Sequence, residues 1–126
     1  MLIFAQSKIR VQQLFEELQK EEIKIGCIHN EKEKEEREEI VKQFRKGEIW
    51  ALICTDLIAR GIDFKGVKLV INYDMPSSVI NYIHRVGRTG RASRTGKAVT
   101  FFTDEDKPFL RSVGNLLKIS VFLQFD

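Results

Sequence analysis

The residues best suited to chemistry lie together at residues 82–91, which read Tyr-Ile-His-Arg-Val-Gly-Arg-Thr-Gly-Arg. Glycines let the backbone turn sharply and approach a ligand closely, and arginine presents a planar fork of donors that fits phosphate oxygens two at a time. Basic residues then recur at every third position from Arg85 to Lys97. This period matches neither a long helix face nor a strand, so we expect a helix end that runs into a loop. The stretch predicts a polyphosphate clamp, and the alternative is a basic loop that only faces solvent.

A second polar stretch, residues 55–63, reads Thr-Asp-Leu-Ile-Ala-Arg-Gly-Ile-Asp and follows a short apolar run. Thr55 stands where we expect a strand to pass into a helix. Its hydroxyl and the nearby backbone amides can hold a phosphate. The alternative is a threonine that only caps the helix.

These two stretches carry a resemblance to a known family. Residues 84–91 resemble the H-R-x-G-R-x-G-R motif of DEAD-box RNA helicases, and residues 55–63 resemble that family's T-D-x-x-x-R-G-x-D motif. The motifs follow in the family's order, about twenty residues apart, and the similarity runs from residue 2 to about residue 118. It covers the second of the family's two RecA-like domains. The phosphate loop of the first domain, G-x-x-x-x-G-K-[ST], does not occur in this sequence.

The resemblance implies that residues 1–126 form one RecA-like three-layer α/β/α domain with a mostly parallel sheet, half of an ATP-dependent RNA helicase. It places Asp63 and Gly61 at the ATP ribose, and it turns Arg88 and Arg91 toward the triphosphate. We expect Arg91 to be the arginine finger, a contribution worth 10³–10⁵ in rate. The cofactor is ATP with Mg²⁺, and the magnesium ligands are expected on the N-terminal domain, so this chain alone should be inactive.

The resemblance also implies contacts to the RNA backbone. Arg37 matches the arginine of a Q-x-x-R element, whereas Lys34 stands where the family has glutamine. A lysine can still meet phosphate as a point charge, and the alternative for Arg37 is a surface ion pair with Glu33. Ser7 and Thr55 complete the expected RNA contacts. Because such contacts read sugar and phosphate, sequence preference should be weak.

Two further residues, His84 and Arg60, match positions that couple the two domains across the cleft in the family that the chain resembles. The N-terminal RecA-like domain of the same helicase is therefore an expected partner. Residues 47–50 and 61–67 resemble the branch that works on small-subunit ribosome precursors. This branch implies pre-ribosomal RNA, a nuclear and nucleolar location, and protein cofactors that the sequence does not name.

Length and composition limit the class of protein that this sequence can form. A chain of 126 residues with 43% apolar residues fits one domain with a packed core. The net charge of +3 suits a nucleic-acid partner without requiring one. Cys27 and Cys54 lie in apolar runs without metal-ligand spacing, which predicts small core residues in a reducing compartment. No metal site, membrane span or signal peptide is expected.

Strand-like and helix-like segments alternate along the sequence, which predicts a mostly parallel sheet with helices on both faces. Ser7 and either Ser77 or Ser78 should cap helices, and Asn30 with Glu33 resembles a capping box. Residues 119–126 are an apolar tail that is either an extra edge strand or an end unrelated to the family. The expected strands are residues 2–5, 23–28, 50–54, 68–72 and 98–102, and the last helix begins at about residue 106.

Two other functions remain open at this point. Gly87 and Gly90 fit the G-x-x-G loop of a KH-type RNA-binding module, although a KH module is shorter and does not begin with three strand–helix units. A non-enzymatic α/β interaction module would keep the fold without the chemistry. Intact Asp63, Arg88 and Arg91 argue against that second alternative.

Overall fold

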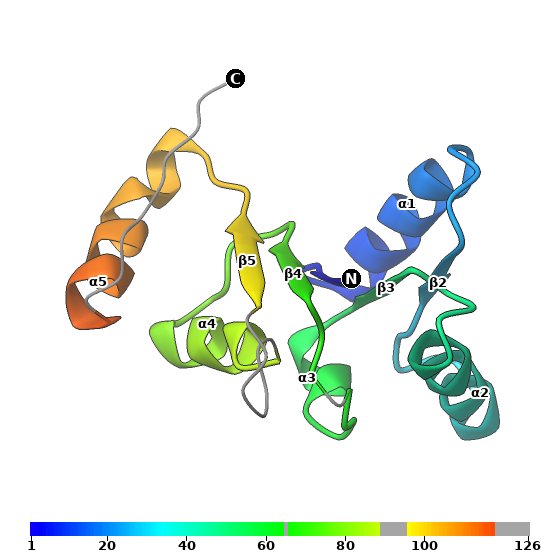
Figure 1. Cartoon of the computed structure of the whole chain (residues 1–126). Helices are drawn as coiled ribbons and strands as arrows, with labels where there is room; N and C mark the ends of the chain where they lie inside the picture. The colour runs from blue at the N-terminus through cyan, green and yellow to red at the C-terminus, as the bar shows by residue number, and fades with distance from the viewer. Residues whose placement is uncertain (65, 89–95, 118–126) are drawn as a thin grey trace.

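One parallel sheet organises the molecule. The computed structural model describes residues 1–64, 66–88 and 96–117. Within them, five strands pair in the order β2-β3-β1-β4-β5, and every neighbouring pair is parallel (Figure 1). The mostly parallel sheet predicted from the sequence is therefore confirmed. The strands are β1 (Leu2–Phe4), β2 (Ile25–Cys27), β3 (Ala51–Cys54), β4 (Leu69–Asn72) and β5 (Lys97–Thr100).

Helices cover both faces of this sheet, as a three-layer domain requires. α1 lies on one face, α2, α3 and α4 lie on the other, and α5 lies beside β5 at the end of the sheet away from β2 (Figure 1). The helices are α1 (Lys8–Gln19), α2 (Lys34–Arg45), α3 (Asp56–Ala59), α4 (Val79–Val86) and α5 (Lys107–Leu117), with the 3-10 turn η1 (Asp104–Asp106) before α5.

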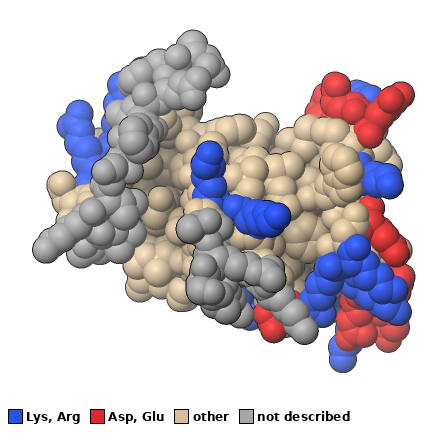
Figure 2. Space-filling model, in the orientation of Figure 1, with Lys and Arg blue, Asp and Glu red and all other residues tan. Residues whose placement is uncertain are grey.

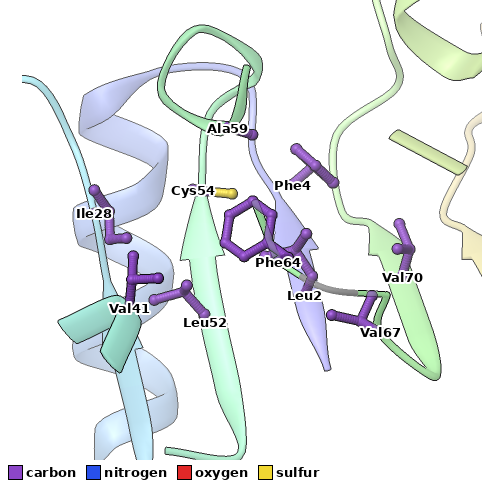
Figure 3. Close-up of a cluster of buried hydrophobic side chains, with 10 residues drawn as sticks. All are labelled: Leu2, Phe4, Ile28, Val41, Leu52, Cys54, Ala59, Phe64, Val67 and Val70. Atoms are coloured by element: carbon purple, nitrogen blue, oxygen red, sulfur yellow. The ribbon is translucent and has the colours of Figure 1, made fainter. Parts of the chain in front are cut away.

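The core divides into two clusters because successive strand residues point to opposite faces. Leu2 and Phe4 join the cluster under α2 and α3, with the Phe64 ring in its middle (Figure 3). Ile3 and Ala5 join the cluster under α1. Burial of each large apolar side chain contributes about 1.5–3 kcal/mol, so the sheet is a firm base for the loops at its edge. Both cysteines are free and buried, as predicted.

The helix starts confirm part of the capping prediction and correct the rest. Ser7 and Ser78 each accept a hydrogen bond from the backbone N–H three residues on, at 3.3 and 3.1 Å. The prediction of a capping box at Asn30 and Glu33 was wrong. α2 begins only at Lys34, and Glu33 is an N-cap residue without a side-chain cap bond. The preceding residues form a backbone turn instead, in which Lys32 N–H donates to the His29 carbonyl at 3.2 Å.

Several element ends also differ from the sequence prediction. Trp50 was placed in a buried strand, but its side chain is 66% exposed and β3 begins one residue later. β5 covers residues 97–100, so Phe101 lies beyond its end and is half exposed. Leu110 and Val113 of α5 are buried as expected. The tail at residues 119–126 lies outside the described residues.

Candidate functional site

Polar residues at the carboxyl ends of β1, β2 and β3 line a pocket of about 360 Å³. The carboxyl ends of parallel strands lie at the same edge of a sheet, and ligands of open α/β sheets bind at this edge. We call this hollow the strand-end pocket. Its lining residues are Gln6, Ser7, Lys8, His29, Asn30, Thr55, Asp56, Leu57, Ile58 and Arg60.

Thr55 lies in this pocket, and its hydroxyl does not cap α3, the helix that follows it. It occupies the N-cap position of α3, but the side chain makes no capping hydrogen bond. Only its backbone carbonyl serves the helix, by accepting from the Ala59 N–H at 3.1 Å. Ser7 differs, because its hydroxyl already accepts the Arg10 N–H, although a serine hydroxyl can still donate. The structure thus brings Ser7 and Thr55 together, as predicted.

A partly buried ion pair joins the two motif stretches. The Arg85 guanidinium donates from Nε and Nη2 to the two Asp56 carboxylate oxygens at 2.7 and 2.8 Å. It also donates from Nη1 to the Asp74 carbonyl at 2.7 Å and stacks over the Phe4 ring, 5.1 Å from its centroid. Arg85 is only 2% exposed. The first arginine of the predicted clamp therefore has a structural role.

Asp74 is committed to the scaffold in a similar way. It follows β4 and accepts from the Gln6 backbone N–H at 2.8 Å and from Arg10 Nη2 at 2.7 Å. Burial alone raises the pKa of Asp74, but these hydrogen bonds and the positive charges of Arg10 and Arg85 hold it below its ordinary value. The carboxylate stays ionised and ties β1 and α1 to the end of β4.

Arg88 contacts the backbone on either side of residues 63–66. The Arg88 carbonyl accepts from the Val67 N–H at 2.8 Å, and Arg88 Nη1 approaches the Ile62 carbonyl at 3.5 Å. Gly61 and Asp63 are both exposed. Arg91, predicted as the finger, lies outside the described residues, and so does Gly90.

His84 and Arg60 are exposed around a small hollow floored by Phe4 and bordered by Arg88. Arg60 Nη2 donates to the Asn81 side-chain oxygen at 2.9 Å, which joins α3 to α4. Both residues therefore lie on one exposed surface next to the Asp56–Arg85 pair.

Arg37 and Lys34 lie in a different pocket from Ser7 and Thr55. This second hollow of about 350 Å³, the α2 pocket, separates α2 from the end of α3 and the segment after it. Figure 2 shows basic and acidic side chains crowded together in the region of α2. The α2 pocket is lined by Lys34, Arg37, Glu38, Val41, Arg45, Ile58, Gly61, Ile62 and Asp63.

The ion pair between Glu33 and Arg37, the alternative role for Arg37, does not form. Glu33 precedes the helix, and its backbone carbonyl accepts from the Arg37 N–H at 2.9 Å. Lys34 reaches Glu38 at 4.0 Å, an exposed contact of little energetic weight. Arg37 is half-buried beside the pocket. The Arg37 guanidinium is therefore not engaged in an ion pair with Glu33.

Two side-chain contacts of the site were missed by sequence reasoning. Asp56 belongs to the 55–63 motif stretch, but nothing in the sequence shows that its carboxylate accepts from Arg85. Arg45, at the end of α2, donates from Nε to the Asp63 carbonyl at 3.0 Å and from Nη2 to the same oxygen. Nothing in the local sequence distinguishes Arg45 from the other charges of its helix.

The described residues contain no group of three or more His, Cys, Asp or Glu side chains placed to hold a metal ion. In the same part of the chain, no helix is long and apolar enough to cross a membrane.

Comparison with known proteins gives concordant matches. The family model described as "Helicase conserved C-terminal domain" matches residues 1–93. The chain is 59% identical over 117 residues to the probable ATP-dependent RNA helicase DDX52 of Mus musculus, covering 93% of this chain and 20% of that protein. It therefore spans about a fifth of the length of this relative.

Solved structures agree with the sequence matches. The C-terminal domain of the DEAD-box protein Dbp5 superposes with a TM-score of 0.86 at 33% identity, covering 94% of this chain and 71% of that one. S. cerevisiae Dbp5 bound to RNA and ADP BeF3 gives a TM-score of 0.83 at 34% identity, covering 90% and 31%. The chain therefore belongs to the family of helicase conserved C-terminal domains, and within it to the C-terminal RecA-like domains of DEAD-box proteins.

Proposed function

We propose that this chain is the second half of an ATP-dependent RNA helicase, which supplies one wall of an ATP cleft and part of an RNA-binding surface. The observation that carries the proposal is the partly buried Asp56–Arg85 pair, which fixes the two motif stretches to each other. Through this pair, the strand-end pocket is tied to the surface formed by Arg88, His84 and Arg60.

On the nucleotide side, the Asp63 carboxylate accepts hydrogen bonds from the ribose hydroxyls of ATP, and Gly61 lets the backbone come close to them. Arg88 and Arg91 face the triphosphate and stabilise negative charge on the transferred phosphoryl group. The contact of Arg88 with Ile62, the residue before Asp63, supports this assignment. Mg²⁺ is held by carboxylates of the N-terminal domain, which also carries the phosphate loop. His84 and Arg60 contact that domain when the cleft closes.

On the RNA side, the free hydroxyl of Thr55 and that of Ser7 bind the backbone in the strand-end pocket. Arg37 and Lys34 bind phosphate from the neighbouring α2 pocket. S. cerevisiae Dbp5 has been solved with both RNA and ADP BeF3, and its likeness to this chain supports both halves of the proposal. The KH-type alternative is wrong, because the chain belongs to the helicase family.

We further propose pre-ribosomal RNA as the substrate and the nucleolus as the location, on the strength of the branch resemblance at residues 47–50 and 61–67. A chimera makes this testable: this chain replaces the 117 matched residues of mouse DDX52. Crosslinking of the tagged chimera in mouse cells should enrich small-subunit rRNA precursors over messenger RNA. Equal recovery of both classes would overturn the proposed substrate.

Replacing Arg37 by alanine in the chimera should weaken binding of single-stranded RNA about tenfold, because one charge-assisted contact to phosphate is lost. The loss should be similar for RNAs of unrelated sequence, since phosphate carries no sequence information. The slope of log affinity against log salt should become shallower by about 0.7, the value for one phosphate on a single strand. Fluorescence anisotropy over a salt series measures both quantities.

Lys42→Ala is the matched control for Arg37→Ala. Lys42 lies on the same helix and is exposed, but it does not line the α2 pocket. It should leave the affinity and the salt slope nearly unchanged. Equal small effects of both substitutions would show that Arg37 contributes only to the general charge of α2.

A further inference from the structure

The end of α2 holds the segment that carries Asp63 by two adjacent contacts. The Arg45 guanidinium donates from both Nε and Nη2 to the Asp63 backbone carbonyl. One residue earlier on the helix, the Phe44 ring meets the Phe64 ring edge to face, with centroids 6.2 Å apart. Two consecutive residues of the helix therefore contact two consecutive residues of the segment. Arg45 contacts Asp63 through polar atoms, and Phe44 contacts Phe64 through apolar surface.

The two contacts differ in what they can control. Phe64 is 4% exposed and sits in the middle of the core cluster, so it anchors the chain whatever happens at the surface. Asp63 is exposed and leads directly out of that anchor. Arg45 adds a second fixed point directly beside this anchor, at the Asp63 carbonyl. Two donors of one guanidinium on this carbonyl restrict the orientation of the peptide group that follows Asp63, and so help to orient its side chain.

The same helix carries the proposed RNA contact. Arg37, Val41 and Arg45 are spaced four residues apart, so they lie on one face, and all three line the α2 pocket with Asp63. Val41 is 6% exposed and packs in the core cluster between them. At 1.5 Å per residue, Arg37 and Arg45 are separated by about 12 Å of rigid helix.

We propose that Arg45 is a positioning residue for Asp63, and that α2 thereby links the RNA contact at Arg37 to the ribose contact of the nucleotide. This inference rests on the proposed function, because it requires Asp63 to bind the ribose. Arg45 touches neither ligand. It acts by holding the Asp63 carbonyl, and so it contributes to nucleotide binding only when the nucleotide has a ribose hydroxyl for Asp63 to meet.

The test compares ATP with 2′-deoxy-ATP and 3′-deoxy-ATP in the chimera at saturating RNA. The unsubstituted chimera should prefer ATP over at least one deoxy analogue by about tenfold in kcat/KM, the scale of one charged hydrogen bond. Asp63→Ala should abolish this preference. Arg45→Ala should reduce it to about threefold or less by raising KM for ATP, while kinetics with the discriminated analogue stay within a factor of two.

Two further variants separate positioning from other roles. Arg45→Lys keeps the charge but offers a point donor instead of a fork, so it should restore only part of the preference. Lys46→Ala removes the neighbouring exposed charge and should behave like the unsubstituted chimera. A purely structural role for Arg45 would lower kcat/KM equally for ATP and the analogues, and this result would overturn the inference.

The outcomes for the two residues distinguish this inference from the proposal on which it rests. If Asp63→Ala leaves the preference for ATP unchanged, the proposed ribose contact is wrong and the positioning role of Arg45 falls with it. If Asp63→Ala abolishes the preference while Arg45→Ala preserves it, the ribose contact stands and only the role of Arg45 is overturned.

Discussion

Replacement of Arg85 by alanine should lower the free energy of unfolding of the 126-residue chain by about 3 kcal/mol, the lower end of the cost of breaking a buried ion pair. The substitution leaves the Asp56 carboxylate and the Asp74 carbonyl without the donors that now hold them. It also opens a cavity against the Phe4 ring. The lower end applies because the Asp56 side chain retains 25% exposure and water can reach it. Urea denaturation followed by circular dichroism measures the change.

Arg10→Ala is the matched control for Arg85→Ala. Arg10 also pairs with a carboxylate and also lies over an aromatic ring, that of Tyr73, but its side chain is 44% exposed. Its removal should cost about 1 kcal/mol or less. Arg85→Lys should recover little, because one ammonium cannot match three acceptors arranged around a planar fork. Similar small losses for Arg85→Ala and Arg10→Ala would refute the scaffold role given to Arg85.

Arg91→Ala in the chimera should lower kcat for RNA-stimulated ATP hydrolysis by about 10³ or more, with a far smaller change in ATP affinity. The proposed finger meets the triphosphate fully only when negative charge moves onto the oxygens that it faces in the transition state. Lysine should rescue little, because it keeps the charge but loses the two-pronged geometry. Steady-state kinetics at saturating RNA, combined with nucleotide titration, separate the two effects.

The control for Arg91→Ala is Arg111→Ala, which removes an exposed arginine from α5. Its kinetics should equal those of the unsubstituted chimera. If Arg91→Ala instead raised Kd for ATP strongly and left kcat unchanged, Arg91 would be a binding residue. Arg88, beside the 62–63 segment, would then become the better candidate for the finger.

The sequence predicted the sheet well because its central strands are continuous apolar runs, a pattern typical of parallel strands covered on both faces. β1 and β3 are such runs and are fully buried. The predicted strand at residues 50–54 included Trp50 because this residue is apolar, although its side chain is exposed and lies outside β3. Apolarity alone cannot show where a buried strand begins.

The sequence predicted less of the site because charge type does not reveal burial. Arg85 and Arg88 are three residues apart and equally basic in the sequence. Arg85 is enclosed by Asp56 and Phe4, whereas Arg88 is half-buried beside Ile62. Only the three-dimensional packing distinguishes a scaffold arginine from a candidate ligand. The contact between Arg45 and Asp63 joins residues 18 positions apart and had no local signal.

The central claim is that this chain forms half of an ATP-hydrolysing cleft and depends on an N-terminal domain for the other half. ATP hydrolysis by the purified chain and by the chimera, each with and without RNA, tests it most directly. The chain alone should show no turnover above background, because it lacks the phosphate loop, whereas the chimera should hydrolyse ATP and accelerate when RNA is added. Clear turnover by the chain alone, or a chimera that folds yet stays inactive with RNA, would contradict the claim.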